Sequence, residues 1–306
     1  MSHGSGLTLH YAAGSDIGQR RELNEDSAYA SPRMLALADG IGGHVHGEIA
    51  SAAVIAALTS LDARLPAADL HQIDLSAALA TGVADASQRL VDLAERDPAL
   101  QGMGTTLTAM LWDGVRFAVA HVGDSRGYVL RDGALAPLTS DHTFVQALVD
   151  DGVMAPEEVA GHPRRSLLLR ALLSTSVAEP DLSVRDGRAG DRYLLCSDGL
   201  TDYVPLDAVG EVLAGAADPA TAVRGLIDLA NSYGGPDNIT CVVADLDQSA
   251  GRVPPQQSRI VVGALAELAA QVPRPAEVSV GAPAGDQAGP EPVPTGGLVG
   301  PASSRM

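Results

Sequence analysis

Two Asp-Gly pairs determine the local topology in the middle of the chain. Asp113-Gly114 and Asp132-Gly133 each stand between two short apolar or alternating runs. Asp-Gly is a preferred dipeptide of two-residue hairpin turns, because both residues of such a turn take positive φ. Consecutive hairpins build an antiparallel meander. The runs that we predict as strands are 34–38, 105–111, 115–121, 126–131, 134–138, 192–196 and 238–246.

Segments with helical periodicity come in pairs between the groups of strands. Apolar residues recur at helical spacing in 48–65, 74–94, 206–216 and 220–232. A doubly wound parallel fold would place one helix after each strand, so this grouping favours an α+β fold with helices layered on antiparallel sheets. The segment 140–173 is less regular, and we expect it to form a flap inserted between strands.

The composition of the chain changes near Gln248. Nine of the 19 prolines lie beyond residue 247, together with repeated glycine and alanine. Such a stretch buries too little apolar surface to offset the entropy lost on ordering. We therefore expect one catalytic domain at 1–247 and a flexible tail at 248–306, with at most one short helix around 260–270.

The charge of the chain excludes several classes of protein. Its 38 acidic and 20 basic residues give a formal net charge of -18, and all the basic residues are arginine. An acidic surface lacks the basic footprint that binds nucleic acid or an anionic membrane. Without lysine, the chain cannot be a Walker A nucleotide hydrolase, a Schiff-base enzyme or a protein kinase.

Location is predicted from what the sequence lacks. No apolar run reaches the roughly 18 residues of a membrane span, and residues 1–13 do not have the pattern of a secretory signal. We expect a cytoplasmic protein without a membrane span. Cys196 and Cys241, each inside an apolar run, are expected to be buried and reduced.

Four aspartates lie at the ends of predicted strands. Asp39, Asp124 and Asp198 each follow an apolar run, and Asp237 immediately precedes one. One Asp-Gly pair is typical of an ordinary turn, but four carboxylates meeting at one sheet edge would take up protons unless a cation compensated them. Oxygen ligands without Cys or His favour Mg²⁺ or Mn²⁺ over zinc. The pattern therefore predicts a metal centre.

A second charged cluster precedes the first of these strands. Arg21 offers the paired donors that suit phosphate oxygens, and Glu25 and Asp26 are placed to hold metal-bound waters. On composition alone, a solvated loop is the alternative interpretation of these charges.

Six short motifs give the chain a family resemblance. They are Arg-x-x-Asn-Glu-Asp-Ser (21–27), Asp-Gly-x-Gly-Gly (39–43), Gly-Met-Gly-Thr-Thr (102–106), Gly-Asp-Ser-Arg (123–126), Ser-Asp-Gly-Leu (197–200) and Asp-Asn-Ile-Thr (237–240). In this order they closely resemble the metal-dependent protein phosphatases, the type 2C serine/threonine phosphatases, and particularly their bacterial branch. The resemblance covers about 7–246. It implies a four-layer α-β-β-α sandwich, with two central antiparallel sheets, helices packed outside and a binuclear metal centre at one end.

The resemblance also implies roles for individual residues. Asp39 would bridge two Mn²⁺ or Mg²⁺ ions, the Gly40 carbonyl would bind one of them, and Asp198 and Asp237 would bind the other. Arg21 would hold the substrate phosphate. The ions would share a water and lower its pKa, so that a metal-bridging hydroxide attacks phosphorus in line.

Two further implications concern a third metal and the general acid. A third, looser metal of bacterial members would lie between Asp124 and Asp198, with Ser166 of the flap nearby. Eukaryotic members carry a histidine after Asp-Gly that is a candidate general acid, but this chain has Ile41 there. His44 is a weak alternative acid, and a loop histidine without a role is the competing interpretation.

The function expected from the resemblance is hydrolysis of phosphoserine and phosphothreonine on proteins, in particular substrates of eukaryotic-like Ser/Thr kinases. The alternatives are a phosphatase of anti-anti-sigma factors and a pseudophosphatase that only binds phosphoproteins. Two rival chemistries have little support. Neither cysteine has an arginine six positions later, and Asp245 lacks the lysine that partners an aspartyl-phosphate nucleophile. Nothing in the sequence determines an oligomeric state, and a monomer is the default expectation.

Overall fold

Two antiparallel sheets form the centre of the fold. The structure is a computed structural model that describes residues 7–41, 46–66, 70–248 and 258–271. The strand order of the first sheet is β1 (Leu7–Asp16), β12 (Ile239–Gln248), β11 (Arg192–Cys196), β7 (Arg126–Arg131) and β8 (Ala134–Pro137). The order of the second is β10 (Asp181–Asp186), β6 (Arg116–Val122), β5 (Leu107–Trp112), β3 (Met34–Asp39), β2 (Asp26–Ala30) and β13 (Ile260–Gly263). A separate short ladder joins β4 (Gly104–Thr105) to β9 (Leu172–Leu173).

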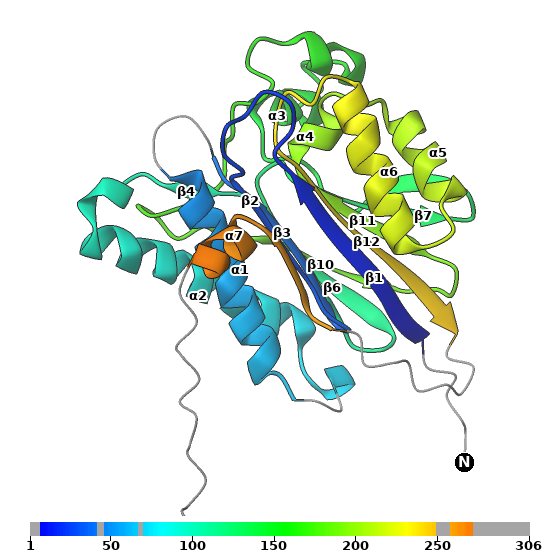
Figure 1. Cartoon of the computed structure of the whole chain (residues 1–306), viewed down its shortest axis with the longest axis horizontal. Helices are drawn as coiled ribbons and strands as arrows, with labels where there is room; N and C mark the ends of the chain where they lie inside the picture. The colour runs from blue at the N-terminus through cyan, green and yellow to red at the C-terminus, as the bar shows by residue number, and fades with distance from the viewer. Residues whose placement is uncertain (1–6, 42–45, 67–69, 249–257, 272–306) are drawn as a thin grey trace, which may run out of the picture. The chain divides into compact units, whose positions relative to one another are not determined.

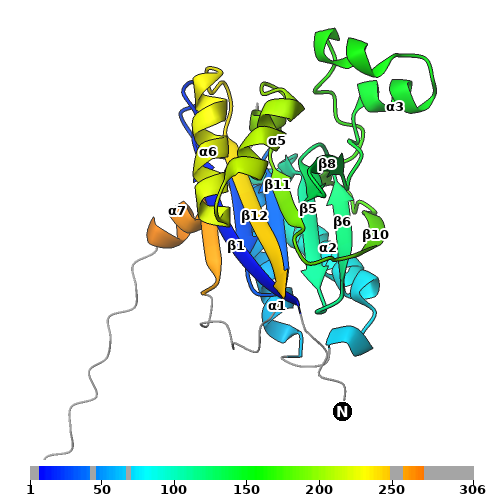
Figure 2. The same cartoon turned by 90° about the vertical axis from the view of Figure 1, so that its right-hand side faces the viewer.

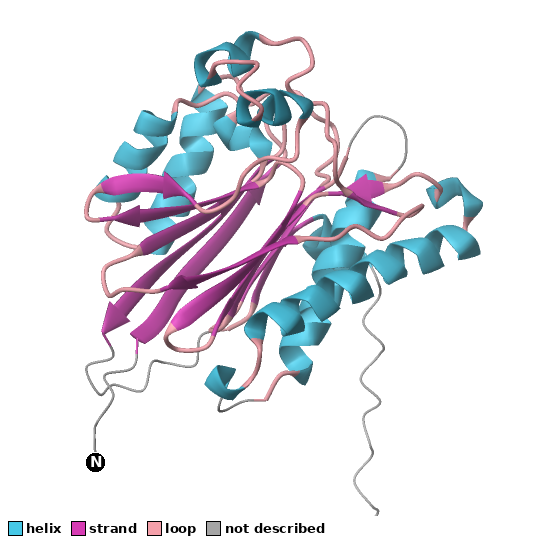
Figure 3. Ribbon diagram, turned by 180° about the vertical axis from the view of Figure 1, so that it is seen from behind, coloured by secondary structure: helices cyan, strands magenta, loops and turns pink. Residues whose placement is uncertain are grey.

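Helices cover the outer face of each sheet (Figures 1 and 3). The α-helices are α1 (Gly47–Arg64), α2 (Leu75–Arg96), α3 (Phe144–Asp150), α4 (Asp198–Thr201), α5 (Leu206–Gly215), α6 (Pro219–Ser232) and α7 (Ala264–Gln271). The 3-10 turns are η1 (Leu70–Gln72), η2 (Pro98–Leu100) and η3 (Pro156–Gly161). Helices α1 and α2 pack on the six-stranded sheet, and α5 and α6 pack on the five-stranded sheet. The predicted four-layer sandwich is confirmed.

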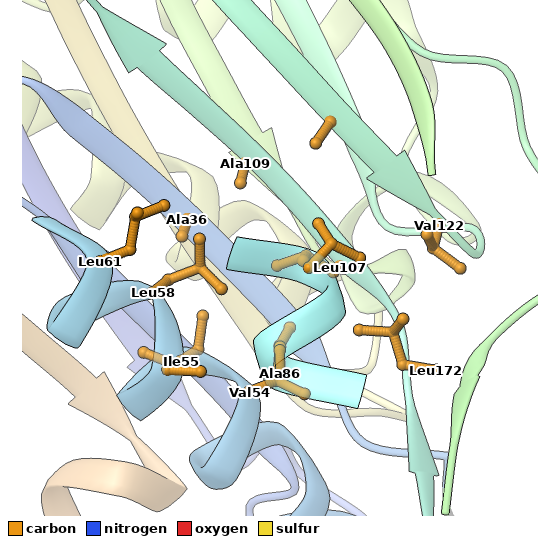
Figure 4. Close-up of a cluster of buried hydrophobic side chains, with 14 of the residues drawn as sticks. Ala36, Val54, Ile55, Leu58, Leu61, Ala86, Leu107, Ala109, Val122 and Leu172 are labelled. Atoms are coloured by element: carbon orange, nitrogen blue, oxygen red, sulfur yellow. The ribbon is translucent and has the colours of Figure 1, made fainter. Parts of the chain in front are cut away.

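Strand β3 shows why both faces of a sheet are apolar in this fold. Ala36 and Ala38 face the helices, whereas Leu35 and Leu37 face the other sheet, because successive side chains of a strand point to opposite faces. The helix side of this core joins residues of α1 and α2 to the sheet, and Figure 4 shows Leu58 among them. The burial of both faces anchors β3 firmly, and so anchors the residue at its end.

Helix boundaries follow local capping chemistry. The Asp74 carboxylate accepts a hydrogen bond from the Ala77 N–H at the start of α2. At the start of α6, the Asp218 carboxylate accepts from the Thr221 N–H, and Pro219 occupies the first turn. The predicted helices therefore agree with α1, α2, α5 and α6 to within two residues. Both cysteines are buried and free, as expected, and they stand opposite each other on β11 and β12.

Some described residues that lie beyond the expected domain limit at 247 pack with the rest of the fold. Ile260–Gly263 form β13, which pairs with β2, and Ala264 after it is buried. The composition of 248–306 did not predict this strand, because the described part that joins the fold, 258–271, is only 14 residues long. The predicted helix at 260–270 is in part the strand β13.

The flap, which contains α3, stands out from the body of the fold (Figure 2). His142, near its start, bonds through its backbone to Gly123 and to Leu169, so the two ends of the flap meet there. Among the described residues, no helix has the length and apolar character that a membrane crossing requires.

Candidate metal centre

Strands β2 and β3 place two carboxylates opposite each other. Asp26 is the first residue of β2 and Asp39 the last of β3, and they are register partners in the antiparallel ladder. The hairpin thus brings together the first and second sequence motifs. Its open end is the end of the sheets at which α4 follows β11 (Figure 1).

Two threonines fix the backbone of Asp39. Thr106 Oγ1 accepts from the Asp39 N–H at 3.0 Å, and Thr105 Oγ1 donates to the Asp39 carbonyl at 2.7 Å. Thr106 Oγ1 in turn donates to Ser125 Oγ at 2.9 Å. The Gly-Met-Gly-Thr-Thr and Gly-Asp-Ser-Arg motifs therefore act as the support of Asp39.

Gly40 has no room for a side chain. A Cβ at this position would lie 2.5 Å from the carbonyl group of Gly47 and 2.7 Å from the Glu25 carbonyl oxygen. The Gly40 N–H donates to that same Glu25 oxygen at 3.1 Å. Glycine at position 40 thus allows β3, the loop before β2 and the start of α1 to converge.

Asp198 and Asp237 come from the other sheet. Asp198 is the first residue of α4, directly after β11, and Asp237 precedes β12. Asn238 ties the loops around them together: its Oδ1 accepts from the Glu25 N–H at 2.8 Å, and its Nδ2 donates to two carbonyls of the loop before β2. The side chain of Asn238 therefore links the two sheets at the site.

The predicted aspartates lie near enough to one another to shift each other's pKa. Burial raises the pKa of Asp39 well above its usual range, and nearby negative charge raises it further. These charges belong to Asp26, Asp198, Asp124 and Asp237. Burial likewise raises the pKa of Asp198, followed by the charges of Asp124, Asp202, Asp237 and Asp26. The carboxyls repel each other and hold protons unless a cation is present.

Asp26 is the most enclosed member of the cluster. Ser197 Oγ donates to its Oδ2 at 2.7 Å, while its Oδ1 is buried without a hydrogen-bond partner. Burial raises the pKa of Asp26 to about 6, and the hydrogen bond from Ser197 is the main effect that opposes the rise. A buried carboxylate oxygen without a donor is one that a cation or its water would satisfy.

Arg21 lies beside the acidic cluster. Its Nη2 is 2.7 Å from Asp237 Oδ2, and 42% of its side chain is exposed. Burial opposes the charge of Arg21, but its hydrogen bond to Asp237 and the charges of Asp237, Glu25 and Asp198 raise its pKa. The predicted phosphate ligand is therefore at the site, within reach of both sheets.

Glu25 stands at the opening of the site, half-buried. Burial is the first cause that raises its pKa, and the charge of Glu48 in the first turn of α1 is the second. His46, just before α1, has φ of 48° and lies 3.1 Å from Glu48 Oε1. Glu25, Glu48 and His46 therefore lie near one another.

An arginine that the sequence did not single out holds a second carboxylate cluster next to Asp124. Arg126 Nη2 is 2.6 Å from Asp141 Oδ2 and 2.9 Å from Asp202 Oδ1. Burial raises the pKa of Asp124 to about 7; Asp141 and Asp202 add to the shift, and Arg126 opposes it. Asp124 thus joins the site through neighbours from the flap and from just after α4.

The structure leaves two predicted positions without support. Ser166 is exposed on the flap, and it is the adjacent Arg165 that approaches Asp202, at 3.8 Å. The role of Ser166 stays a prediction. His44 lies outside the described residues, and its role as general acid also stays a prediction.

The donor set fits hard divalent cations. Within the described residues, no three Asp, Glu, His or Cys side chains form a ready-made ligand cluster. The carboxylate oxygens gathered here are nevertheless the donors that hard divalent cations prefer. The mutual repulsion around Asp39 and the unpaired Asp26 Oδ1 both favour a bound cation.

Sequence reasoning missed the residues that only tertiary contact recruits. Arg126 belongs to a quoted motif, but its partners Asp141 and Asp202 lie in the flap and after α4. Asn238 follows a predicted ligand directly, and an Asp-Asn pair at the start of a strand was the available signal. No local signal in the sequence identified Asp141 as the partner of Arg126.

Comparison with known proteins agrees with this geometry. A sequence profile of the family "Protein phosphatase 2C" matches residues 19–230. The serine/threonine protein phosphatase PstP of Mycobacterium tuberculosis is 51% identical over 258 residues, which are 84% of this chain and 49% of that protein. The chain therefore spans about half the length of this relative. The serine/threonine phosphatase stp of Listeria monocytogenes is 35% identical over 244 residues, 78% of this chain and 96% of the relative.

Solved structures are similar as well. The crystal structure of M. tuberculosis PstP aligns with a TM-score of 0.74 and 52% identity, covering 78% of this chain and 99% of that one. The catalytic domain of PstP in complex with two manganese ions aligns with a TM-score of 0.72 and 50% identity, covering 79% and 99%.

Proposed function

The chain belongs to the protein phosphatase 2C family of metal-dependent phosphatases, and on this basis we propose that it hydrolyses phosphoserine and phosphothreonine in proteins. The observation that carries the proposal is the convergence of Asp39, Asp198 and Asp237 from two sheets beside Arg21. Family members of similar length are named serine/threonine phosphatases, which supports the same activity here.

The proposed metal ligands are residues of this chain that the fold already brings together. Asp39 and the Gly40 carbonyl would hold one Mn²⁺ or Mg²⁺ ion, and Asp39, Asp198 and Asp237 the other. A structure of PstP holds two manganese ions, which supports a divalent cofactor. When bound, such a pair supplies Lewis-acid activation of water and neutralises charge on a phosphoryl group.

The protein's own side chains complete the site. Arg21 would bind phosphoryl oxygens with paired N–H donors and orient phosphorus for in-line attack. Asp26 and Glu25 would accept hydrogen bonds from ordered water and so orient it. Asp124, the nearby charge that most raises the pKa of Asp198, is the ligand that we propose for a third, weaker cation together with Asp198.

The proposed substrates are phosphorylated proteins, in particular those modified by eukaryotic-like Ser/Thr kinases. An exposed Arg21 at the opening of the site suits a phosphate presented on a flexible protein segment.

Hydrolysis assays test the proposal directly. We expect the protein to hydrolyse an aryl phosphate and a phosphothreonine peptide with Mn²⁺, and to lose this activity when a chelator is added. Asp198→Ala should lower turnover by about 10²-fold or more, the size of effect found when one transition-state stabilising group is removed.

The matched control is Asp207→Ala, an exposed aspartate in the first turn of α5. It should leave turnover unchanged. Tight binding of the phosphopeptide without turnover, in any divalent metal, would identify a phosphoprotein-binding pseudophosphatase instead and contradict the proposal.

A further inference from the structure

Strand β2 lies inside the six-stranded sheet and is fully buried. All five of its residues are buried, from Asp26 to Ala30. It pairs on one side with β3 and on the other with β13, which lies more than 200 residues later in the chain. Without β13, β2 would be an open sheet edge, with unpaired N–H and C=O groups next to the metal centre.

Strand β13 fits against β2 at close range. Gly263, its last residue, pairs with Ser27 and has φ of +76°. A Cβ on Gly263 would lie 2.2 Å from the Asp26 carbonyl oxygen. The next helix continues the contact: the Leu265 N–H donates to Ser27 Oγ at 3.1 Å, and Ser27 Oγ lies 3.0 Å from Ser51 Oγ of α1.

Side chains attach the other end of β13 to the same hairpin. Asp62, nearly fully buried, accepts from Tyr29 of β2 at 2.5 Å and from Arg33 at 2.6 Å. Arg259, just before β13, lies 3.8 Å from the same carboxylate. Tyr11 on β1 donates to the Ser258 carbonyl at 3.1 Å. The segment is therefore held at both ends.

This contact leads directly to the candidate metal centre. The backbone of Asp26, against which Gly263 packs, belongs to the residue whose side chain is bonded to Ser197 and opposes Asp39 in the ladder. Any shift of β2 at this point moves the Asp26 carboxylate relative to Asp39.

We propose that residues 258–271 are a positioning element for the metal centre: by completing the sheet at β2, they hold Asp26, and through it Asp39, in the arrangement that binds the cations. The inference rests on the proposed function for its metal, and it adds that a segment beyond the domain limit expected at 247 sets metal affinity.

The test uses the full-length chain with Gly263→Val, which combines a side chain at positive φ with a clash against Asp26. The matched control is Gly133→Val, because Gly133 has nearly the same φ, +79°, and nothing within 4 Å of its Cβ position. Mn²⁺ binding is measured by calorimetry. Hydrogen exchange of the metal-free proteins reports on the amides of residues 26–30.

We expect Gly263→Val to speed exchange in β2 and to weaken Mn²⁺ binding by about tenfold, the lower end of the range for groups that orient metal ligands. High Mn²⁺ should restore kcat. Gly133→Val should change neither exchange in β2 nor Mn²⁺ affinity.

The inference would be overturned if β2 in Gly263→Val exchanged as slowly as in the wild type, or if this variant bound Mn²⁺ with wild-type affinity. The milder Gly263→Ala applies the same criteria if the valine variant fails to fold. A wild-type protein that binds no Mn²⁺ would instead end the proposed function, while exchange in the metal-free proteins would still report whether β13 holds β2.

Discussion

Arg21 Nη2 lies 2.7 Å from Asp237 Oδ2, so the residue expected to hold phosphate is paired with a residue expected to bind metal. The pair joins the loop before β2 to the start of β12, across 216 positions of sequence. A cation that binds the Asp237 carboxylate competes with Arg21 for it. Metal binding would thus release the guanidinium toward the substrate.

Substitution of Arg21 should separate substrate binding from metal binding. We expect Arg21→Ala to lower kcat/KM for a phosphothreonine peptide by about 10²-fold. Mn²⁺ affinity should not fall, because the competing ion pair to Asp237 is gone. The adjacent exposed Arg20→Ala is the control. A parallel loss of Mn²⁺ affinity in Arg21→Ala would mean that Arg21 only supports the loop.

The mostly buried arginine of the second cluster should matter far more to stability than an exposed one. Arg126→Ala leaves Asp141 without its cation and Asp202 with only Arg165, at 3.8 Å, and should cost about 3 kcal/mol of unfolding free energy. Arg64→Ala breaks the exposed pair with Asp85 and should cost under about 1 kcal/mol. Urea denaturation measures both, and equal losses would contradict this account.

A side chain at Gly40 should damage the fold and the site together. Gly40→Ala places a Cβ 2.5 Å from the Gly47 backbone, and overpacking of this kind costs about 1–3 kcal/mol. Gly215→Ala, at an open helical position, should be neutral or slightly stabilising. Thermal unfolding and Mn²⁺-dependent turnover check the pair. Normal activity in Gly40→Ala would show that the Gly40 carbonyl can move freely.

The pKa of Asp124 predicts how stability without metal depends on pH. Folding raises this pKa to about 7, so between its ordinary value and 7 the folded protein holds a proton that the unfolded chain has lost. This contribution to stability therefore declines as the pH rises through that window. Asp124→Asn removes it, and its stability relative to the wild type should increase between pH 5 and pH 8.

The comparison with Asp124→Asn is needed because buried histidines act in the opposite direction. Burial lowers the pKa of His121 to about 4, and the pKa of His142 is also lowered, first by burial. Both histidines are present in both proteins, so their effect cancels in the difference. Chelator-treated samples and urea denaturation at several pH values give the measurement. A difference that is constant with pH would contradict the assignment.

The sequence predicted the layers of the fold because its long elements carry clear patterns. Two Asp-Gly turns and four segments with helical periodicity indicated helices layered on antiparallel sheets, and the family resemblance supplied the four-layer sandwich. The predicted bounds agree closely for strands such as β7 and β11, whereas β1 and β10 were not predicted. The sequence did not predict β2, whose residues Asp-Ser-Ala-Tyr-Ala lack the branched side chains typical of strands. Nor did it predict β13, four residues inside a stretch rich in proline and glycine.

Some residues of the candidate site could likewise be predicted from the sequence, and others could not. Asp39, Asp198 and Asp237 were proposed because each adjoins a strand. The structure puts Asp39 on one sheet and the other two on the second, a division that the sequence pattern did not predict. The contacts of Arg126 could not be predicted, since Asp141 reaches it only when the flap returns to the sheet. The support of Asp26 by Gly263 depends on pairing between residues from opposite ends of the chain, which local patterns do not encode.

The central claim is that Asp39 organises a binuclear divalent metal centre. Calorimetric titration of the metal-free protein with Mn²⁺, for the wild type and for Asp39→Asn, tests it most directly. We predict at least two Mn²⁺ ions per wild-type chain and loss of this binding in Asp39→Asn, with the fold retained by circular dichroism. A wild-type chain that takes up no Mn²⁺, or an Asp39→Asn variant that binds as many ions as the wild type, would contradict the account.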